Sequence, residues 1–116
     1  MTIQNCTIRS TMLGFEDHGI FTNVLYLEGA GWGVGFGTFG FSHNDRDTRK
    51  VIFEGNALGE YIVEVLRVVG ASSWEELVGR HVRFDDRDSN FGADGRLGHF
   101  NEDKWFSPRE WFAARG

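Results

Sequence analysis

The chain has only one cysteine, Cys6, and only one proline, Pro108. A single cysteine excludes an intrachain disulfide and a zinc site built from several thiolates. The sequence has no apolar run approaching the roughly 20 residues that cross a bilayer as a helix. Its first residues lack the basic segment and apolar segment of a secretion signal. We therefore expect a protein of the reducing cytoplasm without a membrane segment.

Basic residues are also scarce, with 12 Lys and Arg against 17 Asp and Glu and a net charge of −5. Proteins that bind nucleic acid directly need a basic face, so this balance argues against that class. An acidic domain suits a partner with a basic surface, although the same acidity also keeps an ordinary domain soluble. The 116 residues include eleven Phe and four Trp, which is enough for one domain, residues 1–116, with an aromatic core.

The most unusual stretch has glycine at every odd position from Gly29 to Gly37. Side chains on a strand alternate between faces, so one face would carry Trp32, Val34 and Phe36 and the other almost nothing. Glycine inside an element costs about 0.5–1 kcal/mol relative to alanine. We therefore expect a helix, an aromatic side chain of a neighbouring strand, or a binding partner to lie close to the bare face.

Apolar runs with strand composition alternate with turn signals along the chain. The predicted strands are residues 3–15, 20–27, 29–41, 80–84 and 96–100. Short connections predict that the first three form an antiparallel meander and the last two a hairpin. Residues 42–50 contain no apolar side chain and are predicted to be an exposed loop, which the short apolar segment 51–53 follows.

One long helix is predicted at residues 56–69, where apolar residues recur at helical spacing and Gly70 stands at the position of a C-terminal cap. The apolar stripe consists of Leu58, Tyr61, Ile62, Val65, Leu66 and Val69. Capping-box spacing predicts short helices near 73–78 and 108–114. The order of elements predicts an α+β fold with an antiparallel sheet of about five strands. The 56–69 helix packs on this sheet, and the glycine face is its candidate dock.

Two sequence patterns superficially suggest a cofactor. Gly35, Gly37 and Gly40 have dinucleotide-motif spacing, but that motif must leave a strand and open a helix, whereas a charged loop follows here. The stretch from Asp86 resembles a calcium loop but has Phe91 and Leu97 where glycine and glutamate are required. We therefore predict no cofactor, no metal and no catalytic residue.

Two other functions stay open at this point. Glu16 and Asp17, with His18, His43, His81 or His99, would serve a small metal- or nucleotide-dependent enzyme. The two histidines on the predicted hairpin, His81 and His99, are candidates to lie close together. A small-ligand binder would instead use the glycine-rich strand and needs an apolar pocket against residues 31–37.

Acidic and aromatic residues cluster toward the C-terminus, a combination that suits a basic protein surface. The acidic residues are Asp85, Asp86, Asp88, Asp94, Glu102 and Asp103, and the aromatic residues are Trp105, Phe106, Trp111 and Phe112. The competing interpretation is that the rings are core and the acids lie in a solvated loop. Glu16 and Asp17 form a second acidic patch. Charge reversal of Asp85, Asp86 and Asp88 is expected to abolish binding without unfolding the domain.

Residues 7–20, TIRSTMLGFEDHGI, resemble small proteins encoded by tailed phages and prophages of bacteria. The resemblance extends to Ser73–Leu77, Gly98-His99 and Trp105-Phe106. It implies a phage accessory protein in the bacterial cytoplasm, a monomer or small homo-oligomer, and supplies no catalytic residues. Small acidic phage proteins are often inhibitors of host machinery. The expected function is therefore non-enzymatic inhibition of a host protein complex, as in anti-CRISPR and other anti-defence proteins.

Overall fold

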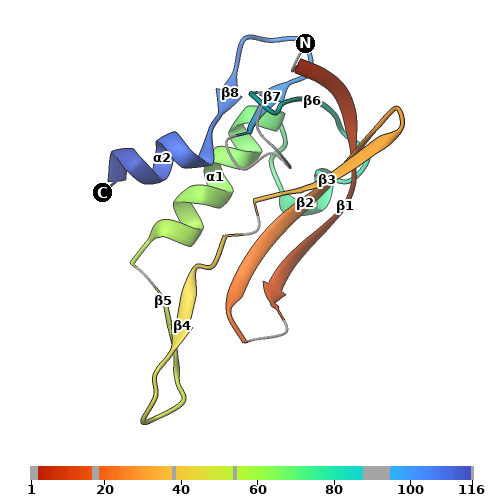
Figure 1. The fold of residues 1–116 in the computed structure, drawn as a ribbon. Helices are drawn as coiled ribbons and strands as arrows, with labels where there is room; N and C mark the ends of the chain where they lie inside the picture. The colour runs from red at the N-terminus through yellow and green to blue at the C-terminus, as the bar shows by residue number, and fades with distance from the viewer. Residues whose placement is uncertain (1–2, 17–18, 38, 54, 88–94, 116) are drawn as a thin grey trace.

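The computed structural model describes residues 3–16, 19–37, 39–53, 55–87 and 95–115. Strands and helices are mixed along the chain, so the predicted α+β class is confirmed (Figure 1). The elements are β1 (Ile3–Phe15), β2 (Phe21–Gly29), β3 (Trp32–Phe36), β4 (Ser42–Asn44), β5 (Val51–Phe53), α1 (Ala57–Val69), the 3₁₀ turn η1 (Trp74–Glu76), β6 (His81–Asp85), β7 (Arg96–His99), β8 (Trp105–Phe106) and α2 (Pro108–Arg115).

The described strands form a six-stranded antiparallel sheet in the order β3-β2-β1-β6-β7-β8 and a separate two-stranded sheet, β4-β5. The main sheet thus has one strand more than expected, because the short strand β8 adds to its edge. The predicted meander β1-β2-β3 is confirmed, and so is the β6-β7 hairpin, in which Val82 lies opposite His99. β1 joins the two parts, since it pairs with β6 over Ile3–Thr7 and with β2 over Thr7–Phe15.

A register shift between Ile8 and Ser10 interrupts the β1-β2 ladder. Such a bulge moves the residues that follow it to the opposite face of the sheet. Ile8 lies opposite Leu27, and both are in the core. Met12, four residues after Ile8, lies opposite Val24 and lines a hollow on the other face. The bulge therefore gives one strand two differently oriented halves.

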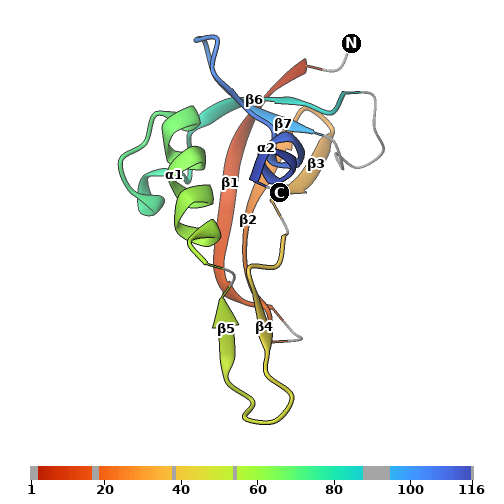
Figure 2. The same ribbon diagram turned by 90° about the vertical axis from the view of Figure 1, so that its left-hand side faces the viewer.

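Both helices cover the same face of the sheet (Figures 1 and 2). α1 buries Tyr61, Val65, Val68 and Val69, and α2 packs Trp111 and Phe112 against the same core. The predicted helix is confirmed with a start at residue 57. Gly70 ends it with φ 84° and donates its N–H to the carbonyl oxygen of Leu66. A helix C-terminus needs this left-handed conformation, which glycine adopts without strain.

The two predicted capping boxes have different outcomes. The hydroxyl of Ser107 accepts the backbone N–H of Glu110 at 3.3 Å, which caps α2 as expected. Ser73 makes no such bond. Instead the carboxylate of Glu76 accepts the N–H of Ser72 at 2.8 Å. Residues 74–76 consequently form a single 3₁₀ turn in place of the short helix predicted for 73–78.

The prediction that α1 docks on the glycine face is wrong. Trp32, Val34 and Phe36 pack against the core, and Gly33 and Gly35 are exposed on the face opposite to the helices. Burying three large apolar side chains outweighs the closer approach that bare backbone permits. Among the described residues of the predicted 29–41 strand, Trp32–Phe36 forms β3 and Gly29 is the last residue of β2. The helix does approach one glycine beyond β3, since a Cβ added to Gly37 would be 2.7 Å from the hydroxyl of Tyr61 in α1.

The predicted loop 42–50 is also partly wrong, because Ser42–Asn44 is a strand that pairs with Val51–Phe53. Strand pairing uses backbone groups, so it needs no apolar side chain in β4. At the turn, the carboxylate of Asp45 accepts the N–H groups of Asp47 and Thr48 at 2.8 and 2.9 Å. We call residues 42–53 the arm. It projects from the rest of the molecule (Figures 1 and 2). The whole molecule, with the arm, measures 48 × 28 × 26 Å.

Candidate functional site

A groove of about 790 Å³ lies where the arm meets α1 and α2, and we take it as the candidate functional site. Its apolar lining is Phe53, Leu58, Val63 and Trp111. Its polar lining includes Glu60 and Glu64, with Gly55, Asn56 and Gly59 between the arm and the helix. Figure 1 shows the base of the arm beside the first turn of α1. The groove therefore combines an apolar floor with carboxylates.

The local backbone explains how the groove forms. Gly55 has φ 60° and lies between β5 and α1, a conformation that other residues seldom adopt. The carbonyl of Asn56 accepts the N–H of Glu60 at 3.1 Å, which starts the helix. At the other strand of the arm, the Ser42 hydroxyl accepts the N–H of Phe21 at 2.8 Å. These contacts hold the arm base against the body.

The apolar side chains at this site are unusually exposed. Phe53 is 44% exposed and Val63 is 61% exposed, and the neighbouring Val51 and Ile52 are exposed as well. Phe53 packs edge-on against Phe21, with ring centroids 5.5 Å apart. Isolated exposed apolar residues are common, but a continuous patch marks an interaction surface.

Two ion pairs hold the carboxylates of the groove. Glu60 binds the guanidinium of Arg115 at the end of α2. Glu64 binds Arg67 one helical turn further on, at 2.6 Å. Both pairs are partly exposed to solvent, where an ion pair contributes little to stability. Either carboxylate can therefore accept a cation from another molecule.

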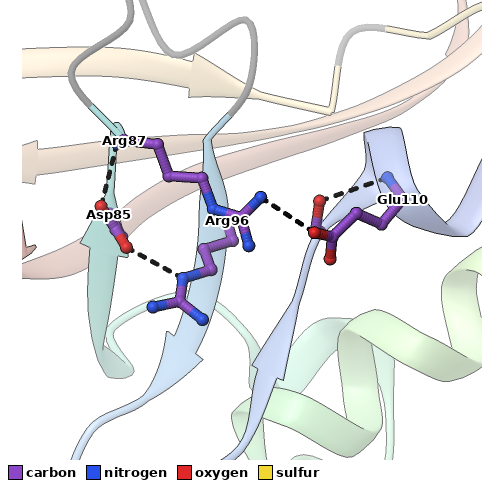
Figure 3. Close-up of polar contacts among 5 residues, drawn as sticks. Asp85, Arg87, Arg96 and Glu110 are labelled. Atoms are coloured by element: carbon purple, nitrogen blue, oxygen red, sulfur yellow. Dashed lines mark hydrogen bonds and ion pairs between the residues drawn. The ribbon is translucent and has the colours of Figure 1, made fainter.

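Among the residues that the structure describes, the acidic side chains predicted to bind a partner are not brought together. Asp85 is only 5% exposed, and its carboxylate accepts N–H groups from Arg96 Nε and from the backbone of Arg87, both at 2.9 Å. Arg87 in turn binds Glu110 of α2 at 3.2 Å (Figure 3). Asp86 is half-buried beside this network. Asp85 thus serves an internal network, and it does not lie on the exposed loop surface where we expected it.

The other four acidic residues predicted near the C-terminus are Asp88, Asp94, Glu102 and Asp103. Asp88 and Asp94 lie outside the described residues. Glu102 and Asp103 are exposed in the turn between β7 and β8.

The turn between β7 and β8 is built around His99. Its Nδ1 accepts the N–H groups of Asn101 and Glu102 at 3.2 and 3.1 Å, so the ring proton belongs on Nε2. That nitrogen lies 3.2 Å from the Glu102 carboxylate. Arg83 binds the carbonyl oxygens of His99 and Glu102, each at 2.8 Å. The predicted binding residue Glu102 therefore also stabilises its own turn.

Glu16, of the second acidic patch, directly follows β1, and that end of β1 lies far from the β7-β8 turn (Figure 1). Its carboxylate accepts the N–H of Ile20 at 3.1 Å, and its carbonyl oxygen accepts the N–H of Gly19 at 2.9 Å. It thus closes the turn between β1 and β2. Asp17 and His18 lie outside the described residues.

The structure also shows where the residues of the two alternative functions, a metal-dependent enzyme and a small-ligand binder, lie. Among the described residues, no three His, Cys, Asp or Glu side chains gather as metal ligands would. His81 lies opposite Thr7 and His99 opposite Val82, so the two histidines are on opposite faces of the sheet. An open hollow of about 320 Å³ does lie against Gly33 and Gly35, and the Arg9–Glu28 ion pair and Tyr26 border it. The apolar pocket expected of a small-ligand binder is therefore partly charged.

Sequence reasoning missed the groove, although two signals were present. Val63 is an apolar residue on the side of α1 that Glu60 and Glu64 mark as solvent-facing. Residues 51–53 are apolar but too short to form a core strand by themselves. Neither signal shows by itself that the arm meets the helix.

Comparison of the chain with protein-family models, with curated proteins and with solved structures found no match in any of the three. Within the part of the chain that the structure describes, no helix has the length and apolar character required to cross a membrane. The function proposed below consequently depends on the geometry of the groove.

Proposed function

We propose that this protein is a non-catalytic binding protein that docks another protein in the groove between the arm, α1 and α2. The observation that carries the proposal is the exposure of Phe53 and Val63 at the rim of a groove of about 790 Å³. Protein interfaces are centred on apolar anchors that become buried on binding, surrounded by polar contacts. The groove supplies both parts.

The chemistry of the groove defines the class of partner. Phe53, Leu58 and Val63 suit an apolar side chain, and Glu60 and Glu64 suit Lys or Arg next to it. The net charge of −5 adds a long-range attraction for a basic surface, which speeds association at low salt. We therefore propose a partner segment in which an apolar residue is flanked by basic residues. We keep the basic partner expected from the sequence, but we propose the groove as its docking surface in place of the acidic loop of residues 85–94.

We further propose that the partner belongs to a bacterial host protein complex, including CRISPR and other defence complexes, and that binding inhibits it. The resemblance of residues 7–20 to tailed-phage proteins supports this part of the proposal. The groove geometry supports binding to a basic and apolar segment, and inhibition would follow where that segment is the functional surface of the complex.

Pull-down from bacterial lysate with two matched variants tests the proposal. Val63→Asp places a charge in the groove, and Val78→Asp places one at a similarly exposed valine, 52% against 61%, outside the groove lining. We expect a stoichiometric partner that wild type and Val78→Asp capture, that Val63→Asp loses, and that raised salt weakens. The proposal fails if no captured protein depends on Val63.

A further inference from the structure

The tip of the arm is basic, in contrast to the groove. Residues 45–50 carry three basic side chains, Arg46, Arg49 and Lys50, against two aspartates. All three basic side chains are exposed, and none has an ion-pair partner among the described residues. Asp45 is occupied by the backbone of the turn itself. The arm thus offers cations at its tip, whereas the groove at its base offers Glu60 and Glu64, which are held in partly exposed ion pairs with Arg115 and Arg67.

The apolar residues Val51, Ile52 and Phe53 connect the tip of the arm to the groove. β5 pairs only with β4 in the two-stranded sheet of the described residues, so its outer edge is open to another strand. An exposed edge strand with apolar side chains readily pairs with another chain. The arm therefore resembles the class of partner that the groove suits, an apolar segment next to basic residues.

The position of the groove makes this complementarity reciprocal. In a two-fold symmetric dimer, every contact occurs twice. If the arm tip of the first copy contacts the groove of the second, the arm tip of the second copy contacts the groove of the first. Two arms lying antiparallel about such an axis place the tip of each arm at the base of the other. Since the groove is at the base, both tips reach a groove at once.

We propose that a second copy of this chain occupies the groove, through a reciprocal exchange of arms in which the basic tip of each arm meets Glu60 and Glu64 of the other copy. This inference rests on the proposed function, because the groove that the second copy covers is the proposed docking surface. Self-association and binding of the target then exclude each other. Dilution, or a target that binds more tightly, opens the groove.

Two short arms form an interface at the small end of the range, below about 1,200 Å² in total, where association is weak and reversible. We therefore expect wild type to change from monomer to dimer between about 1 µM and about 500 µM at low salt. Sedimentation velocity over this range gives the dissociation constant. Raised salt is expected to shift the transition to higher concentration, because the tip and groove charges are exposed.

Charge-swap variants test the contact. The tip variant is Arg46→Glu with Lys50→Glu, and the groove variant is Glu60→Lys with Glu64→Lys. Each variant alone is expected to raise the dissociation constant at least about tenfold, a loss of about 1.4 kcal/mol. An equimolar mixture of the two is expected to restore dimers, since each tip then meets a groove of opposite charge. A monomeric wild type, or a mixture that stays monomeric, would overturn the proposal.

Cysteine labelling tests whether association covers the groove. Cys6 is buried, so Val63→Cys introduces the one exposed thiol, and Val78→Cys is the matched control outside the groove. We expect the maleimide labelling rate at Val63→Cys to fall as the dimer fraction rises, while the rate at Val78→Cys stays constant. Equal rates at both sites in the dimer would contradict a covered groove.

These experiments are separable from the test of the proposed function. If wild type is monomeric throughout and the lysate partner still depends on Val63, the arm exchange fails and the proposed function stands. If dimers form and mask Val63 but no partner depends on that residue, the proposed docking of another protein fails and self-association stands.

Discussion

The indole ring of Trp105 lies directly on the backbone of Gly98. The two residues are opposite each other in the β7-β8 ladder, and a Cβ added to Gly98 would lie 2.5 Å from the ring. The guanidinium carbons of Arg83 and Arg96 are 4.7 and 4.2 Å from the ring centroid. Two cation–π contacts thus hold the ring on a surface that only glycine leaves flat enough.

Replacing Gly98 by alanine is expected to lower the free energy of unfolding by about 1–3 kcal/mol, the usual cost of overpacking a filled site. The added methyl group must push Trp105 away from Arg83 and Arg96. Urea denaturation followed by circular dichroism measures the loss. Tryptophan fluorescence of the folded variant reports the displaced ring.

Gly59 provides the matched control, because an added Cβ there meets nothing within 4 Å and the residue lies inside α1. Gly59→Ala is expected to raise the free energy of unfolding by about 0.5–1 kcal/mol through helix propensity. If both glycine variants change stability in the same direction, the contact between Gly98 and Trp105 is not the cause.

Replacing Asp85 by alanine is expected to lower the free energy of unfolding by about 1–3 kcal/mol, because Arg96 and the Arg87 backbone lose their buried acceptor. Asp103→Ala, at an exposed residue of the β7-β8 turn, should stay within about 0.5 kcal/mol of wild type. Equilibrium unfolding in urea compares the two variants. Equal stability would show that the Asp85 network contributes nothing.

This result would also revise the expectation for charge reversal at Asp85, Asp86 and Asp88. We now expect the triple variant to be destabilised, so that lost binding by it would not identify a docking surface. The groove variant Val63→Asp avoids this ambiguity, because the side chain of Val63 is largely in solvent.

Replacing Tyr61 by phenylalanine is expected to raise the free energy of unfolding by about 1 kcal/mol. The Tyr61 hydroxyl is fully buried and has no hydrogen-bond partner among the described residues, so its removal abolishes a desolvation cost. The carboxamide of Asn23, which also lies next to Gly37, is likewise buried without a hydrogen-bond partner among the described residues. Thermal unfolding checks the sign, and a destabilised variant would show that the hydroxyl is bonded in solution.

Stability is expected to decrease with pH above about 8.5, where a cysteine of the unfolded chain loses its proton. Burial raises the pKa of the Cys6 thiol to about 12, so the folded state keeps that proton. The unfolded state then binds fewer protons, and the free energy of unfolding falls by at most about 1.4 kcal/mol per pH unit.

The comparison with Cys6→Ala isolates this effect of pH. The variant has no thiol, so the stability difference between wild type and variant should shrink between about pH 8.5 and pH 10. Above that range Tyr61 lowers the stability of both proteins, because burial also raises its pKa, and this contribution cancels in the difference. A difference that stays constant with pH would contradict the assignment to Cys6.

Helical spacing of apolar residues predicted α1, because burial of one helix face requires that spacing. Strand composition and flanking turn signals predicted β1 and β2. β4 was missed because its pairing with β5 uses backbone groups alone. The glycine face was misassigned because spacing shows that a face is bare but does not show which face the helices cover.

The buried placement of Asp85 was missed for a different reason. Asp85 directly follows the first predicted hairpin strand, and Arg96 is the first residue of the second. In the antiparallel pair these two residues lie opposite each other. Extending the pairing of the predicted hairpin to Asp85 would therefore have predicted the ion pair. Nearness along the chain suggested a shared acidic surface, whereas pairing across the hairpin decided where the carboxylate points.

The two-sided pairing of β1 has a consequence for synthesis. Residues 3–7 of β1 pair only with β6 and not with β2, apart from the shared Thr7, and the pair Thr7–His81 is 74 residues apart in sequence. The meander β1-β2-β3 closes through local contacts, whereas the β1-β6 pairing must wait until residue 85 has left the ribosome. Because pairing between distant segments slows folding, we expect its closure to set the folding rate. Until then the first strand made has an open edge, and it is the segment of the nascent chain most exposed to wrong partners.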